Sequence, residues 1–161
     1  MRTASRSVNY FMSRVILLDA GPLGLITNPR ASAENGECNL WMQTHLGKGN
    51  QVLIPGIADY EVRRELLRAS KMAGVSKLDA LCKQVGYDPV TPEVLRQAAL
   101  FWAQSRNAGR ITAPDTALDG DVILAAHAAI LRRQGYQSVV ATTNVKHLEW
   151  FVPAYRWREI H

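Results

Sequence analysis

Short apolar runs alternate along this chain with longer segments of helical periodicity. A short, continuous apolar run bounded by turn residues is typical of a strand buried on both faces of a sheet. Such runs predict strands at Val15–Asp19, Gln51–Ile54, Tyr87–Val90 and Gln137–Thr142, with a final edge strand at Tyr155–Ile160. Because strands that alternate with helices form βαβ units, the pattern predicts an α/β fold of three layers, α/β/α, with a central parallel sheet of about five strands.

The segments between these strands carry apolar residues at helical spacing. They predict helices at Glu37–Leu46, Ala58–Lys71, Ser76–Val85, Pro92–Asn107 and Asp121–Gln134. Thr91 is a suitable N-cap for the fourth of these helices, because Pro92 then stands at the first helical position. The glycines and the proline at 21–24 predict a turn after the first strand, and residues 109–118 predict a polar loop.

Composition narrows the class of protein. The chain has 161 residues, of which 47% are apolar and 20% charged, as expected for one globular domain. We expect that domain to span residues 15–161, after a flexible, basic extension at residues 1–14. No apolar run is long enough to span a bilayer and no signal-peptide core is present, so the sequence predicts a cytoplasmic protein without a membrane partner. Cys38 and Cys82 are then expected as reduced thiols, not as a disulfide or zinc site.

The charge of the chain agrees with a polyanionic partner such as nucleic acid. The net charge is +5 and the pI is about 9.5. Much of this charge lies on the outer face of the helix predicted at Ala58–Lys71. Its arginines, Arg63, Arg64 and Arg68, form either a solvated face or a track of phosphate contacts, and helical geometry lets some of them point to one side. Arg64, Arg68 and Lys146 are the candidate nucleic-acid-binding residues.

Four oxygen-bearing side chains stand next to apolar runs that are far apart in the sequence. Asp19 closes the first strand, Glu61 follows the second, Asp121 opens the apolar run 122–126, and Asn144 follows the fourth strand. Because the carboxyl ends of parallel strands share one edge of a sheet, we expect these side chains to converge. Carboxylates forced together repel one another unless protons or a divalent cation neutralise them. Ligands that are all oxygen atoms favour Mg²⁺ or Mn²⁺ over zinc.

The acidic candidates have competitors. Glu65 could take the place of Glu61, since both lie on the same predicted helix, although the spacing from the strand favours Glu61. One of Asp119 and Asp121 is expected to cap the helix that both residues precede. We assign the ligand role to Asp121 because it adjoins the buried run, and Asp119 stays open as a further carboxylate.

The remaining candidates also have plainer structural interpretations. Thr142 could fill a strand end, and Asn144 could be a turn residue. Asp59 is better suited to capping a helix than to binding a cation. Asp19 has no helix-capping context, because a turn is predicted after it, and this favours a ligand role.

The candidate residues sit in four segments that resemble the PIN-domain nucleases, a family that includes the VapC toxins of bacterial toxin–antitoxin pairs. The segments are VILLDAGPL at 15–23, IPGIADYE at 54–61, DGDVILAA at 119–126 and TTNVKHL at 142–148. They occur in the family's order, and the resemblance covers residues 15–151. The order of all four segments carries the resemblance, because no single segment is specific.

The resemblance implies a metal-dependent endoribonuclease that hydrolyses RNA phosphodiesters by a metal-activated water, with Mg²⁺ or Mn²⁺ as cofactor. Asp19, Glu61 and Asp121 would hold the cation and form the catalytic set together with Asn144. Asp119 would be a further metal ligand, and Thr142 would support the site.

The resemblance also implies partners. Family members commonly form homodimers, and a toxin would be blocked by an antitoxin protein. Two departures stand against full activity: Ala-Gly-Pro follows Asp19 where many members have Thr-Asn, and Asn144 stands where many have Asp. The alternative is therefore a PIN-fold nucleic-acid-binding or interaction protein with little or no catalytic activity. The sequence does not separate an RNA substrate from a DNA substrate.

Overall fold

The predicted sheet is present, and its strands are parallel. The computed structural model describes residues 13–109 and 115–161. Its strands are β1 (Val15–Leu18), β2 (Gln51–Pro55), β3 (Gly86–Asp88), β4 (Ser138–Thr142) and β5 (Ala154–Arg156). They lie in the order β3-β2-β1-β4-β5. The extension predicted at residues 1–14 falls almost wholly outside the described residues.

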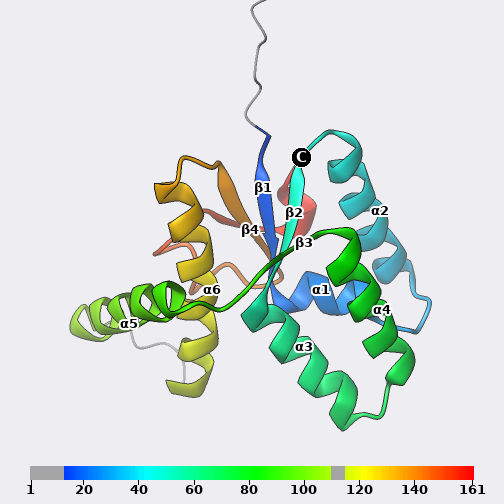
Figure 1. Ribbon diagram of the computed structural model, residues 1–161, viewed down its shortest axis with the longest axis horizontal. Coiled ribbons are helices and arrows are strands. Elements are labelled where there is room, and N and C mark those ends of the chain that lie inside the picture. The colour runs from blue at the N-terminus through cyan, green and yellow to red at the C-terminus, as the bar shows by residue number, and fades with distance from the viewer. Residues whose placement is uncertain (1–12, 110–114) are drawn as a thin grey trace, which may run out of the picture.

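Helices cover both faces of this sheet. They are α1 (Ala20–Thr27), α2 (Ala33–Gly47), α3 (Gly56–Arg68), α4 (Met72–Gln84), α5 (Pro92–Asn107) and α6 (Asp115–Arg133), followed near the C-terminus by a 3-10 helix at Trp157–Glu159. Helices α1 to α4 pack on one face, and α6 packs on the other with α5 outside it (Figure 1). The predicted three-layer α/β/α fold is therefore confirmed. None of the described helices is both long and apolar enough to cross a bilayer.

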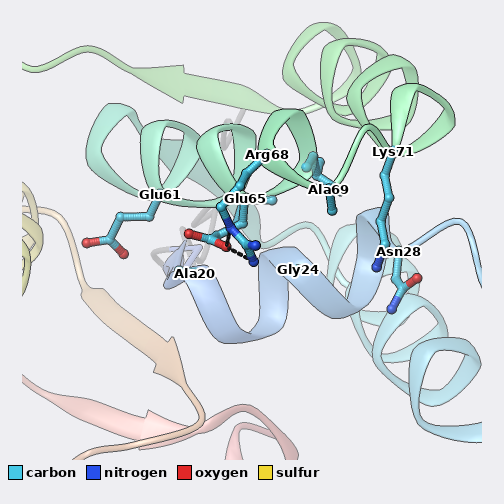
Figure 2. Close-up of a pocket in the computed structure, with 10 residues that line it drawn as sticks. Ala20, Gly24, Asn28, Glu61, Glu65, Arg68, Ala69 and Lys71 are labelled. Atoms are coloured by element: carbon cyan, nitrogen blue, oxygen red, sulfur yellow. Dashed lines mark hydrogen bonds and ion pairs between the residues drawn. The ribbon is translucent and has the colours of Figure 1, made fainter.

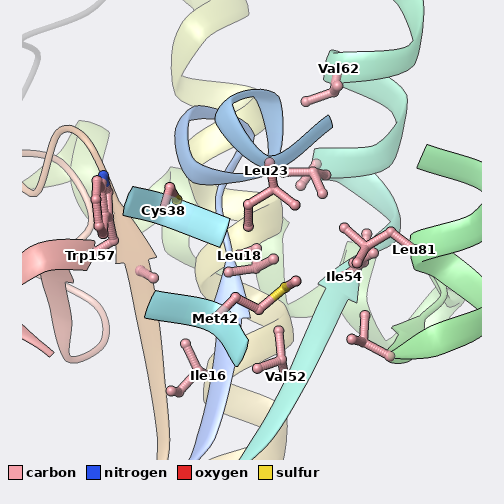
Figure 3. Packing of buried hydrophobic residues seen from close by; sticks show 14 of the residues in the cluster. Ile16, Leu18, Leu23, Cys38, Met42, Val52, Ile54, Val62, Leu81 and Trp157 are labelled. Carbon is pink, nitrogen blue, oxygen red and sulfur yellow. The ribbon is translucent and has the colours of Figure 1, made fainter. Parts of the chain in front are cut away.

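Strand β1 lies at the centre of the sheet, and its sequence reflects that place. Its four residues are at most 1% exposed, because β2 and β4 flank the strand and helices cover both of its faces. Ile16 and Leu18 face the helices α1 to α4, in the cluster that Figure 3 shows. Val15 and Leu17 face α6. A continuous apolar run is the pattern that burial on both faces requires.

The turn predicted at residues 21–24 is wrong, because this segment forms helix α1. Asp19 is the N-cap, and its carboxylate accepts a hydrogen bond from the backbone N–H of Ala20. Pro22 stands in the first turn, where a missing N–H removes no helical hydrogen bond. The expectation that Asp19 lacks a helix-capping context is therefore also wrong.

Other element boundaries move as well. Helix α6 begins at Asp115, so Asp119 and Asp121 lie inside it and neither caps it. The sequence interpretation missed its first turns because the acids interrupt the pattern, although Leu118 continues the apolar stripe that packs on α5. Residues 110–114 of the loop predicted at 109–118 lie outside the described residues. Helix α4 begins before Ser76, and the final strand ends at Arg156.

Candidate functional site

Three carboxyl groups from three separate elements meet beyond the carboxyl ends of the strands. Asp19 directly follows β1, Glu61 projects from α3, and Asp121 projects from α6. Burial raises the pKa of all three. The charge of Asp19 further raises the pKa of Glu61 and of Asp121, and the charge of Asp121 adds to that of Glu61. The three acids therefore lie close enough to repel one another.

Asp19 is held in a fixed orientation. Its Oδ1 accepts the hydrogen bond from the Ala20 N–H at 2.7 Å, and its Oδ2 accepts one from the hydroxyl of Thr142, also at 2.7 Å. Thr142 ends β4 and is fully buried, so its side chain ties two neighbouring strands together at this edge. Both hydrogen bonds lower the pKa of Asp19, but burial outweighs them.

Asp121 carries the clearest sign of crowding. Burial and the nearby charge of Asp19 raise its pKa from 3.8 to about 6. Glu61 approaches the same helix so closely that a Cβ atom at Gly120 would collide with its Oε1. Arg64, one turn further along α3, lowers the pKa of Glu61 but does not offset the burial and the two acids. A site that raises the pKa of its acids in this way favours binding of a cation or protonation of the acids.

The competing acids lie elsewhere. Glu65 is exposed and forms an ion pair with Arg68, with Oε2 2.8 Å from Nη2. Asp119 is exposed and lines a groove between α5 and α6 beside Trp102. Because each helical residue turns by about 100°, Asp119 and Asp121 point to nearly opposite sides of α6. This placement does not support Asp119 as a ligand of the same cation.

Asn144 follows β4 but uses its side chain in a local turn. Its Oδ1 accepts a hydrogen bond from the N–H of Lys146 at 3.3 Å, and its own N–H donates to the hydroxyl of Thr142 at 3.0 Å. Asn144 and Lys146 are both exposed. Thr142 therefore touches the acidic cluster directly, whereas Asn144 reaches it through Thr142.

A groove of about 370 Å³ runs from Glu61 between α1 and α3. Figure 2 shows acidic side chains toward one end and Lys71 toward the other. The residues that line it include Ala20, Gly24, Asn28, Glu61, Glu65, Arg68, Ala69 and Lys71. The groove thus joins the acidic cluster to basic side chains at the end of α3.

The arginines predicted on α3 have different surroundings. Arg63 is engaged by Asp59 at 2.9 Å and by Asp79 on α4 at 2.8 Å, so it braces two helices. Asp59 is in the first turn of α3 but is not its N-cap, which is Pro55. Arg64 is exposed, and its guanidinium lies 5.3 Å from the centre of the Tyr60 ring. Arg63 is thus held by two acids in a partly buried position, whereas Arg68 pairs with Glu65 alone and both side chains of that pair are exposed.

Sequence interpretation missed a buried acid–histidine pair on the α6 side of the sheet. His127 of α6 is fully buried, and its Nδ1 lies 2.8 Å from Oδ2 of Asp88 at the end of β3. Its Nε2 has no hydrogen-bond partner among the described residues. In the sequence, a histidine within the Ala-Ala-His-Ala run of a buried helix was a visible but unspecific signal, and Asp88 lies 39 residues away.

The acidic cluster fits a divalent cation by its chemistry. Its donors are carboxylate oxygens, which suit Mg²⁺ or Mn²⁺, and each acid has a raised pKa that a nearby positive charge would lower. Among the residues that the structure describes, no three His, Cys, Asp or Glu side chains already stand in an arrangement that could hold a metal ion. Because two hydrogen bonds hold Asp19, the carboxyl groups of Glu61 and Asp121 would be the ones to turn toward a cation on binding it.

Comparison with known proteins identifies the fold. No protein-family profile matches the chain, and no curated protein sequence is similar enough to match. Solved structures do match. VapBC2 from Rickettsia felis bound to a DNA fragment from its promoter gives a TM-score of 0.66 at 16% identity, over 89% of this chain and 98% of the other. VapBC-1 from nontypeable Haemophilus influenzae gives 0.61 at 14%, over 90% and 99%.

A third match comes from a differently named complex. FitAcB from Neisseria gonorrhoeae gives a TM-score of 0.59 at 17% identity, over 90% of this chain and 99% of the other. At such identities the likeness establishes the fold alone. The resemblance predicted from four short segments is thus confirmed at the level of the fold, which this chain shares with the VapBC and FitAcB structures.

Proposed function

We propose that the protein is a metal-dependent endoribonuclease of the PIN type. The observation that carries this proposal is the meeting of Asp19, Glu61 and Asp121. Burial raises the pKa of all three acids, and the charge of Asp19 further raises the pKa of Glu61 and of Asp121. Such an arrangement destabilises the ionised acids unless a ligand neutralises them. A purely structural cluster would have been relieved by a buried base or by apolar side chains, since unpaired buried charges are costly.

Asp19, Glu61 and Asp121 would hold Mg²⁺ or Mn²⁺. When bound, the cation would lower the pKa of a water molecule and stabilise the negative charge that develops on a phosphodiester. The hydrogen bonds from the Ala20 N–H and the Thr142 hydroxyl hold the Asp19 carboxylate in one orientation. Thr142 would act through Asp19, and Asn144 would act through the turn that positions Thr142.

RNA would reach the site along basic side chains. Arg64 and Arg68 on α3 and Lys146 after β4 are exposed, and the net charge of +5 favours a polyanion. Arg64 is near enough to lower the pKa of Glu61, and Arg68 lines the same groove as Glu61. Arg64 lies over the Tyr60 ring, an exposed aromatic surface that could take part in base stacking. The assignment of RNA over DNA comes from the resemblance to VapC toxins.

The proposal extends to partners. The VapBC and FitAcB structures share the fold of this chain, which supports an antitoxin protein as a partner. A homodimer is supported by Leu95 and Trp102, two exposed side chains of α5 that line one groove against α6. Exposed apolar side chains that lie next to one another often mark a protein interface.

The proposal is tested with purified protein, single-stranded RNA and Mn²⁺, with and without chelator. We expect cleavage that chelator stops and that Asp19→Asn and Glu61→Gln each lower by roughly 100-fold or more. Glu65→Gln is the matched control, one helical turn away and exposed, and should leave cleavage nearly unchanged. Cleavage that survives both chelator and Asp19→Asn would reject the metal assignment. RNA binding without cleavage in the wild type would instead favour the PIN-fold binding protein.

A further inference from the structure

Helix α6 carries a glycine directly before Asp121. Gly120 is six residues into the helix, where alanine would be the more favourable residue. The backbone does not require glycine at this position, since the glycines with positive φ among the described residues are Gly49, Gly109 and Gly135. The reason for a glycine must therefore lie in what surrounds it.

The surroundings of Gly120 contain one close neighbour. A Cβ atom built at residue 120 would collide with Oε1 of Glu61, and the other atom it would approach is Cδ of the same side chain, at 3.6 Å. Gly36, on the exposed side of α2, shows the opposite situation, because a Cβ atom there would meet nothing within 4 Å. Among the residues that the structure describes, the space above Gly120 is thus filled by the carboxyl group of Glu61 alone.

We propose that Gly120 is a positioning residue, which leaves the space through which Glu61 reaches Asp19 and Asp121. The consequence for metal binding rests on the proposed function, but the contact itself does not. The carboxyl group of Glu61 is the end of a flexible side chain. A methyl group at residue 120 would therefore turn this carboxyl group away and leave the backbone in place. The fold would tolerate Gly120→Ala, whereas the acidic cluster would lose one of its three members.

The first measurement is Mn²⁺ affinity without substrate, by calorimetry and by the EPR signal of free Mn²⁺. Gly120→Ala should weaken binding by about 10- to 100-fold, the range for residues that orient metal ligands. Gly36→Ala should leave it unchanged. In a Glu61→Ala background, Gly120→Ala should have no further effect, because no carboxyl group is left to displace. Equal losses with and without Glu61 would overturn the proposal.

Thermal stability excludes the trivial explanation that the variant unfolds. Because alanine favours helix, Gly36→Ala should raise Tm by about 2–4 °C, and Gly120→Ala should not lower Tm. A Tm well below that of the wild type would show that residue 120 is needed for packing and would contradict the proposal.

A crystal structure of metal-free Gly120→Ala separates this proposal from the proposed function. We expect the carboxyl group of Glu61 turned out of the cluster, with α3 and α6 unmoved. If the wild type binds no Mn²⁺, the nuclease proposal fails while this result still decides the role of Gly120. Glu61 in its original place, beside a shifted α6, would overturn the positioning role.

Discussion

The two ends of the central sheet each carry a cluster of polar side chains, and they are built in opposite ways. At the amino ends of the strands, His45 of α2 is 2% exposed. Its Nε2 lies 2.9 Å from the carbonyl oxygen of Ile160, and its Nδ1 lies 2.9 Å from Nδ2 of Asn50. One neutral tautomer satisfies both contacts, because Nε2–H donates to the carbonyl and Nδ1 accepts from the amide. At the carboxyl ends, three acids repel one another.

This contrast in how well the polar groups are satisfied separates a structural cluster from a candidate functional site. Around His45 every donor meets an acceptor, and the Oδ1 of Asn50 is itself occupied by the N–H of Arg14 at 3.2 Å. Burial lowers the pKa of His45, so the neutral ring suits its place. At the acidic end, two hydrogen bonds to Asp19 and the charge of Arg64 near Glu61 do not offset burial and repulsion, so the pKa values stay raised. The repulsion between the acids lowers the free energy of unfolding, and a ligand that binds to the acids can raise it again.

The comparison predicts its largest effect at His45. His45→Ala leaves the Ile160 carbonyl and the Asn50 amide without this partner and removes a fully packed ring, so it should lower the free energy of unfolding by about 2–4 kcal/mol. Urea denaturation at neutral pH measures the change. Thr44→Ala, at the exposed neighbouring position, is the control and should stay within about 0.5 kcal/mol. A loss below about 1 kcal/mol at His45 would mean that the cluster does not hold the C-terminal segment in place.

The acidic end should respond in the opposite direction. Asp121→Asn should stabilise the metal-free protein at pH 8, because the pKa of Asp121 is raised to about 6 and its ionised form is therefore disfavoured in the fold. The gap between 3.8 and 6 corresponds to about 3 kcal/mol at most, and we expect about 1–3 kcal/mol because the carboxyl group is partly exposed.

The control for this prediction lies two residues away. Asp119→Asn removes the same charge from an exposed position on α6 and should change the free energy of unfolding by less than about 0.5 kcal/mol. Excess Mn²⁺ should stabilise the wild type more than Asp121→Asn, since the variant lacks a carboxylate ligand. If Asp119→Asn stabilised the metal-free protein as much as Asp121→Asn does, the effect would come from net charge and not from the acidic cluster.

The sequence predicts the acidic end better than the histidine end, for a physical reason. Asp19 follows a strand that must be buried on both faces, so its place at the carboxyl edge could be inferred from the local pattern. His45 and Ile160 are 115 residues apart, and their hydrogen bond depends on how α2 meets the C-terminal segment. No local pattern carries that information.

The errors at the acidic end have the same origin. Glycine and proline at 21–24 are typical of a turn, but the cap from Asp19 and the tolerance of the first helical turn for proline produce α1. Gly120 gave no signal at all, since its role depends on a side chain from another helix. The sequence placed Asp19, Glu61 and Asp121 near the strand ends, but it left Asp119 open and gave no indication of the residues that shape the space between the acids.

The smallest predicted effect is in the pH dependence of stability, where the two ends act with opposite signs. Burial lowers the pKa of His45 below 6.5, its ordinary value, so the unfolded chain takes up this proton first and stability falls as the pH drops below about 6.5. The positive charges of Arg14, Lys48 and His161 act in the same direction. The raised pKa of Asp121 has the reverse effect: stability rises as the pH falls from about 6 toward 3.8.

Two variants separate these contributions, each of which is limited to about 1.4 kcal/mol per pH unit for one proton. His45→Gln keeps a neutral donor and acceptor, so below about pH 6.5 its stability should rise relative to that of the wild type as the pH falls. The stability of Asp121→Asn should instead fall relative to that of the wild type below about pH 6, because the proton uptake of Asp121 is lost while that of Asp19 and Glu61 remains. Urea midpoints of the metal-free proteins at several pH values measure both slopes. If His45→Gln follows the wild type throughout, the ring is protonated without penalty. The matched hydrogen bonds would then not be what keeps it neutral, and the contrast between the two ends of the sheet would lose its histidine half.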